Sequence, residues 1–209
     1  RYSDYTIREY IRNFIMSKLE TNTIDTISGS NTLTLGGTNL TTVNMASGVS
    51  PGTGMGKVLQ VKSATKTDTQ SSTTTTFADV TGMSVSITPS STSSKILAFG
   101  YCNSAYHNGS AKVAIQLVRD TTNIIIGDAS GSRSRLTGFA YVAQDNLAPV
   151  PLTFNFLDSP STTSATTYKI QFARLDPQGT VYVNRSYLDQ DTAIMGRVAS
   201  TITVMEIAG

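Results

Sequence analysis

The chain has 209 residues, of which 14% are charged and 8% are aromatic, and Thr and Ser together supply 57 of them. A typical soluble domain is about 25% charged, so this chain is polar through hydroxyl groups more than through ions. The formal net charge of +2 favours neither nucleic acid nor an anionic membrane surface as a partner. One cysteine and one histidine exclude an intrachain disulfide and leave too few ligands for a metal site built on thiolates or imidazoles. The apolar runs are too short for a transmembrane helix, so no membrane insertion is expected.

Residues 1–20 have the pattern of an amphipathic helix. Large apolar side chains recur there at three-and-four spacing, with basic residues between them, and this stripe consists of Ile7, Tyr10, Ile11, Phe14, Ile15 and Leu19. Thr6 and Glu9 fit a capping box at the start of the helix. A helix of about four turns is marginal alone in water. We therefore expect the stripe to pack against the same helix of other copies or against a docking surface.

Residues 21–47 are rich in Thr, Ser, Asn and Gly, with single aliphatic residues between them. One chain cannot bury enough apolar surface there to offset the entropy of ordering it. Three chains wound together could share an axis lined by these aliphatics, so the segment is predicted to be a trimeric stem. Residues 48–56 contain four glycines and one proline, which is typical of a hinge.

From residue 57 to residue 209 the apolar pattern changes to a period of two. Alternation is clear in five segments, which are 83–87, 113–117, 152–156, 168–172 and 201–204. Turn signals such as Asn108-Gly109 and Asp158-Ser-Pro160 separate the segments. The pattern predicts half-buried antiparallel strands that form one β-sandwich of the jelly-roll type. The chain as a whole is predicted to be mainly β.

Catalytic chemistry is poorly supported by the sequence. A glycosidase needs two carboxylates about 5 to 10 Å apart, but most Asp residues here occupy turn positions at which Asp caps its own backbone, as at Asp120, Asp158 and Asp176. A Ser-His-Asp arrangement would have to use His107, next to an expected Asn-Gly turn. Asp189-Gln-Asp191 begins a calcium loop but lacks its Gly and distal Glu, so it is interpreted as a solvated loop. We predict a protein that is not an enzyme, with no catalytic residue, metal site or cofactor.

Binding residues are easier to propose. Tyrosine side chains stack on sugar rings, and the candidates outside the predicted helix are Tyr101, Tyr106, Tyr141, Tyr182 and Tyr187. Strand aromatics more often pack in a core or in a seam between subunits. Arg133 and Arg135, in the loop from Asp128 to Arg135, are suited to anionic glycans. The predicted receptor-binding residues are Tyr106, His107, Arg133 and Arg135.

Five blocks of residues 56–209 also carry a family resemblance. They are GKVLQV at 56–61, FADVTGMSVSITPSSTSSKIL at 77–97, LVRDTTNIIIGD at 117–128, LDSPSTTSATTYKIQ at 157–171 and STITVMEIAG at 200–209. In this order they resemble the globular domain of bacteriophage tail-fibre-like structural proteins, a type abundant among viruses of aquatic bacteria. The resemblance implies a homotrimeric jelly-roll knob on the virion surface, at the phage tail or the capsid exterior.

Two functions follow from these expectations. In the first, the protein is a tail fibre or knob that attaches to other virion proteins through the helical stripe and binds a host surface glycan or protein. In the second, it is a capsid decoration, cement or head-fibre protein without receptor binding. The low charge and hydroxyl-rich composition suit both. The position of the protein in the virion separates the two hypotheses.

Overall fold

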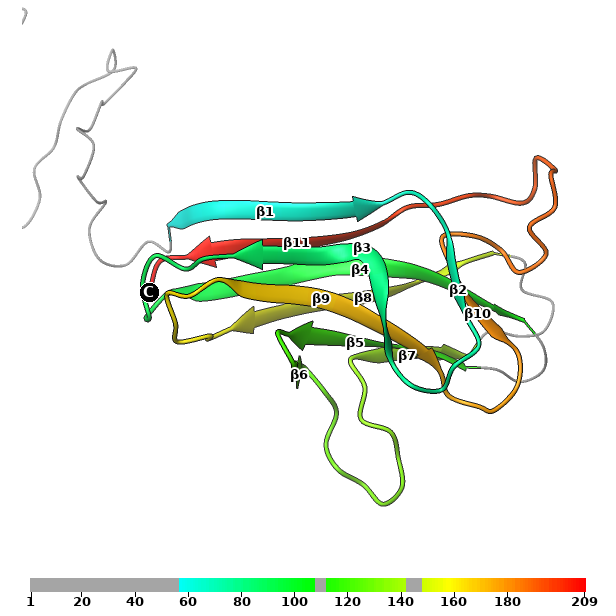
Figure 1. The fold of residues 1–209 in the computed structure, drawn as a ribbon, viewed down its shortest axis with the longest axis horizontal. Helices are drawn as coiled ribbons and strands as arrows, with labels where there is room; N and C mark the ends of the chain where they lie inside the picture. The colour runs from blue at the N-terminus through cyan, green and yellow to red at the C-terminus, as the bar shows by residue number, and fades with distance from the viewer. Residues whose placement is uncertain (1–56, 108–111, 142–147) are drawn as a thin grey trace, which may run out of the picture. The chain divides into compact units, whose positions relative to one another are not determined.

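The computed structural model describes residues 57–107, 112–141 and 148–209. The predicted helix (1–20), stem (21–47) and hinge (48–56) lie outside these residues. The described residues form eleven strands in chain order (Figure 1), namely β1 (Val58–Lys66), β2 (Gln70–Ser72), β3 (Ala78–Ile87), β4 (Lys95–His107), β5 (Lys112–Arg119), β6 (Thr122–Ile124), β7 (Gly138–Tyr141), β8 (Val150–Asp158), β9 (Thr166–Arg174), β10 (Thr180–Val183) and β11 (Ser200–Ile207). In this described part of the chain, no helix is long and apolar enough to cross a membrane.

The strands form two antiparallel sheets. Sheet A has the order β1-β11-β4-β10-β2, with β8 on the other edge of β4, and sheet B has the order β3-β9-β5-β6, with β7 also on β5. In sheet A, β11 and β10 lie end to end along one edge of β4. β1 and β2 also lie end to end, with β1 paired to β11 and β2 paired to β10. In sheet B, β6 and β7 share the edge of β5 that β9 leaves free. Each sheet is therefore four strands wide, and the predicted two-sheet antiparallel β-sandwich is confirmed for the described residues.

The connections between strands cross from one sheet to the other almost everywhere. With strands that lie end to end taken together, only the step from β5 to β6 stays within its sheet. Eight strands in two sheets with this crossing connectivity form a jelly roll. Loops therefore gather at the two ends of the sandwich (Figure 1).

The core lies between the sheets, where the alternating residues of both meet. Met83, Ile115 and Ile202 are fully buried there, as their period-two pattern predicts. Strand β5 departs from the prediction of a half-buried strand, because six consecutive residues from Val113 to Val118 are buried. Its second face is covered locally, since the Gln116 side chain donates a hydrogen bond to the Arg135 carbonyl at 3.3 Å.

Candidate functional site

The two ends of the sandwich are defined by strand register. Val58 pairs with Ile207, which pairs with Lys95, so the chain enters strand β1 and leaves strand β11 at the same end. His107 pairs with Thr180 at the opposite end, which we call the distal end. The loop between β10 and β11, residues 184–199, also projects beyond the far end of β1 (Figure 1). We call this segment the distal loop.

A buried polar network holds the base of the distal loop. Asn184 is fully buried, and its Nδ2 donates to the carbonyls of Lys66 and Asp68 at 2.8 and 3.0 Å. Ser200 Oγ donates to Asn184 Oδ1 at 2.6 Å, and the backbone N–H of Asn103 donates to Ser200 Oγ at 2.9 Å. Because every member of the network has hydrogen-bond partners, the network fixes both ends of the distal loop, where it leaves β10 and where it enters β11.

Charged and aromatic side chains gather on the distal loop. The Arg185 guanidinium lies 4.2 Å from the ring centroid of Tyr182, a cation–π contact. Asp189 binds two guanidinium groups, with Arg185 Nη1 at 3.1 Å and Arg197 Nη2 at 2.7 Å. Asp189 thus orders two arginines, and Arg197 keeps 57% of its side chain exposed. The Asp189-Gln-Asp191 segment uses its first carboxylate for these ion pairs.

His107 and Tyr187 complete this surface. Their rings stack with centroids 4.8 Å apart and an interplanar angle of 28°. His107 is exposed and Tyr187 is half-buried, so the stacked pair is accessible to solvent. We call His107, Tyr182, Arg185, Tyr187, Asp189 and Arg197 the distal cluster. The sequence singled out His107 as the one histidine, next to an expected turn, and named Tyr182 and Tyr187 as tyrosines able to stack on sugar rings. No local signal joins Asp189 to two arginines.

The structure does not support the predicted receptor-binding role of Tyr106. Its side chain is only 4% exposed, because it lies on the core side of β4, next to the exposed His107 in sequence. Its hydroxyl donates to Asp176 Oδ1 at 2.9 Å and also contacts the Gln178 carbonyl. Burial, together with the hydrogen bond to Asp176, raises the pKa of Tyr106 to about 12. Tyr106 therefore stabilises the β9–β10 turn from the core side, and its side chain is not accessible to a receptor.

Arg133 and Arg135 lie in the loop between β6 and β7, which projects away from sheet B (Figure 1). Both are exposed. Arg133 Nη1 donates to Ser130 Oγ at 2.9 Å, and Arg135 Nε donates to the Gly127 carbonyl at 2.6 Å. The structure therefore places the arginine pair on a different element from His107, and the two form separate candidate surfaces.

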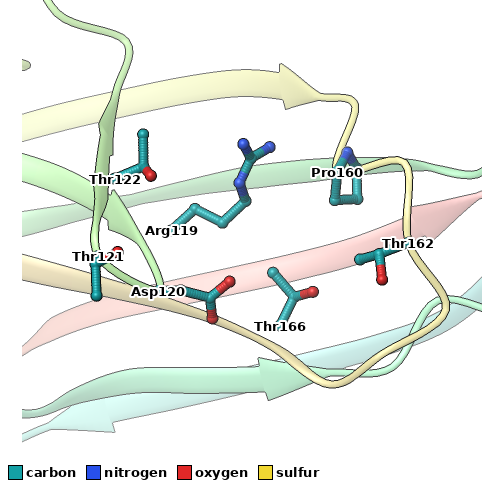
Figure 2. A pocket seen from close by; sticks show the side chains of 7 residues that line it. All are labelled: Arg119, Asp120, Thr121, Thr122, Pro160, Thr162 and Thr166. Atoms are coloured by element: carbon teal, nitrogen blue, oxygen red, sulfur yellow. The ribbon is translucent and has the colours of Figure 1, made fainter.

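A small pocket of about 260 Å³ opens at the end where the chain enters. It is lined by Arg119, Asp120, Thr121, Thr122, Pro160, Thr162 and Thr166, with the Arg119 guanidinium between Thr122 and Pro160 (Figure 2). This volume lies below the usual range of ligand pockets, about 300–1,000 Å³. The Asp120 carboxylate accepts a hydrogen bond from the Thr167 N–H at 2.8 Å. The lining offers hydrogen bonding and no nucleophile–base pair.

Asp158, beside this pocket, differs from its interpretation as a turn residue. It is the last residue of β8 and is buried. Arg119 and the Tyr168 hydroxyl both donate hydrogen bonds to its carboxylate. Asp176 does cap its turn, since it accepts a hydrogen bond from the Gln178 N–H at 3.1 Å. The three aspartates therefore have three different structural roles.

Comparisons with known proteins give little further guidance. No protein-family model matches the chain, and no curated protein matches it. Among solved structures, the VP2 subviral particle of infectious bursal disease virus matches with 15% identity over 71% of this chain and 41% of that chain, at a TM-score of 0.26. The tripod (BppUct-A-L) from the baseplate of bacteriophage Tuc2009 matches with 10% identity over 99% of this chain and 92% of that chain, at a TM-score of 0.19. At such identities and TM-scores, neither likeness establishes a shared fold or a function.

Proposed function

We propose that the protein is a bacteriophage virion surface appendage, a tail fibre or knob that recognises the host cell by non-covalent binding. The resemblance of residues 56–209 to tail-fibre-like proteins supports this, as does the jelly-roll connectivity. The observation that carries the proposal is the distal cluster, which lies at the end of the sandwich remote from the chain entry. An appendage anchored through its N-terminal segment presents that end to a target.

The chemistry of the distal cluster suits a bacterial surface glycan. Aromatic ring edges and faces pack against sugar rings, and a guanidinium group offers forked donors to carboxylates or phosphates. Arg197 is exposed while Asp189 holds its orientation, so less side-chain freedom is lost on binding. The proposed mechanism is binding alone, without a catalytic step.

In this proposal, the N-terminal segment attaches the protein to the virion. The apolar stripe from Ile7 to Leu19 would pack on other virion proteins, and three copies would share the stem. The same architecture would serve a capsid decoration, cement or head-fibre protein. Labelled-antibody microscopy of virions distinguishes the two, since tail labelling at low copy number supports the appendage and lattice labelling at high copy number supports decoration.

Binding assays test the recognition step directly. Fluorescently labelled full-length protein is applied to a panel of bacterial cells and to an array of purified bacterial surface polysaccharides. We expect Tyr187→Ala/Arg197→Ser to lose most of the binding, while Arg133→Ser/Arg135→Ser, a matched change on the other candidate loop, retains it. Loss in the second variant alone would transfer recognition to the β6–β7 loop. A wild-type protein that binds no cell and no polysaccharide would favour the decoration hypothesis.

A further inference from the structure

The outer face of sheet A carries an apolar row that crosses the full width of the sheet. Val61 pairs with Met205, Met205 with Leu97, and Leu97 with Leu157. Residues directly opposite each other in a sheet point to the same face. Their sequence neighbours Val204, Ile96 and Asp158 are buried, so this row faces away from the core.

Large apolar side chains on the strands of sheet A are exposed to solvent. Nine large apolar side chains are exposed in the described residues, and five of them belong to β1, β4 and β8 of sheet A, namely Val58, Leu59, Val61, Tyr101 and Leu157. Val61 is 49% and Leu157 is 55% exposed. Single exposed apolar residues need no explanation, but a contiguous patch marks an interaction surface.

Charge is also nearly absent from the part of this face that β1, β4, β8 and β11 form. Among the outward positions of β1, β4, β8 and β11, the one charged residue is Lys95, at the end near the chain entry, where its Nζ donates to Ser159 Oγ at 2.9 Å. The outer face of sheet B differs, because it carries the Lys169–Asp79 ion pair at 3.0 Å and a hydrogen bond from Gln171 to Asp79. Depletion of charge is typical of the core of a protein–protein interface.

The position of the patch indicates what covers it. Residues 1–56 join the described domain at Lys57, immediately before Val58 and Leu59 of this face. Those residues include the segment 21–47, whose scattered aliphatics the sequence predicts to be buried between chains. Copies joined through that segment would have the Val58 ends of their sheets held close together.

We propose that the outer face of sheet A packs against a second copy of this chain, with Val61, Leu97, Leu157 and Met205 at the centre of the contact. The interface is independent of what the distal cluster binds, and it serves a receptor-binding appendage and a decoration protein equally. It also leaves the distal loop, at the other end of the sandwich, available to a partner.

Cysteine labelling of the full-length chain tests this interface. Leu157→Cys places a thiol on the proposed contact, and Ser84→Cys places a matched thiol on the exposed outer face of sheet B. The native Cys102 is fully buried, so its lack of reaction with maleimide reports that the domain is folded. We expect the thiol at position 157 to react about tenfold more slowly than that at position 84, because thiol reactivity follows access to solvent. Sedimentation equilibrium should show that both variants are oligomers, with a mass at least twice the 22.3 kDa of one chain.

The alternatives give different results. Equal labelling of the two thiols would overturn the proposal, whatever the mass. Slow labelling at position 157 in a 22.3 kDa monomer would also overturn it, and would assign the face to the chain's own N-terminal segment. Adding Val61→Lys should restore labelling at position 157 while Cys102 stays unreactive. Protection that persists with this lysine at the centre of the row would likewise contradict an apolar contact between copies.

Discussion

Arg119 Nη1 donates hydrogen bonds to both carboxylate oxygens of Asp158, at 2.8 and 2.9 Å. The Asp158 side chain is only 7% exposed, and the Tyr168 hydroxyl donates to the same carboxylate at 2.6 Å. Burial, reinforced by this hydrogen bond, raises the pKa of Tyr168. Asp158 belongs to sheet A, and its two partners belong to sheet B. The ion pair therefore joins the two sheets at the end where the chain enters.

Removing one member of this pair should destabilise the fold. Arg119→Met leaves a buried carboxylate without its cation, and we expect the free energy of unfolding to fall by about 3 kcal/mol. In Arg119→Met/Asp158→Leu no charge remains, so part of that loss should be recovered, although the Tyr168 hydroxyl loses its acceptor. Urea unfolding of the three proteins measures the effect. A double variant less stable than Arg119→Met would show that the pair is not coupled in this way.

Acid stability should depend on Glu206. This carboxylate is fully buried and accepts hydrogen bonds from Ser90 N–H, Ser90 Oγ and Gln60 Nε2 at 2.7, 2.6 and 2.7 Å. Burial alone would raise its pKa, but the hydrogen bonds outweigh burial and lower the pKa from 4.5 to about 2.

Between these two pKa values the unfolded chain binds more protons than the folded one, so lowering the pH favours unfolding. The stabilisation, on the order of 3 kcal/mol, should be complete above pH 4.5 and lost as the pH falls towards 2. Urea unfolding from pH 6 to pH 2 should show this loss in the wild type and a flatter profile in Glu206→Gln. Parallel profiles for the two proteins would assign the acid sensitivity to other carboxylates.

Two glycines with nearly the same positive φ should respond differently to alanine. Gly82 and Gly179 have φ values of +83° and +85°, a region that costs an L-residue about 1–2 kcal/mol. A Cβ at Gly82 meets nothing within 4 Å, whereas a Cβ at Gly179 collides with the His107 carbonyl and the Tyr106 ring and hydroxyl. We expect Gly82→Ala to cost about 1 kcal/mol and Gly179→Ala about 3 kcal/mol or more. Thermal unfolding of both variants checks the ranking, and equal losses would refute the steric argument.

The N-terminal stripe provides a prediction about assembly. Ile11→Asp/Ile15→Asp places two charges on the apolar stripe, and unpaired charges against an apolar partner cost several kcal/mol. We expect the variant to be missing from purified virions while the β-sandwich unfolds at the wild-type temperature. Immunoblotting of virions measures incorporation, and Lys18→Ser serves as a control outside the stripe. Normal incorporation of the double variant would remove the stripe as the anchor.

Local sequence pattern determined the class of fold and much of its core. Alternation at 83–87, 152–156 and 201–204 predicted which side chains face inward, because successive residues of a strand point to opposite faces whatever the strand pairs with. The same rule marks Tyr106 as buried beside an exposed His107 once the strand is known. Tyr106 was proposed as a binding residue because tyrosine side chains stack on sugar rings, but its position in the long strand β4 places it in the core.

Tertiary structure alone decided which strands are neighbours. The apolar row on sheet A and the distal cluster both depend on these pairings. Val61, Leu97, Leu157 and Met205 form one row although they come from four strands that are far apart in the chain. Asp189 likewise meets Arg197 only because the distal loop folds back between the fixed ends of β10 and β11. Period-two patterning assigns a residue to a face, whereas the pairing of faces across a jelly roll is set by contacts between distant segments. Those contacts are formed through the burial of the whole core and are encoded by no single stretch of sequence.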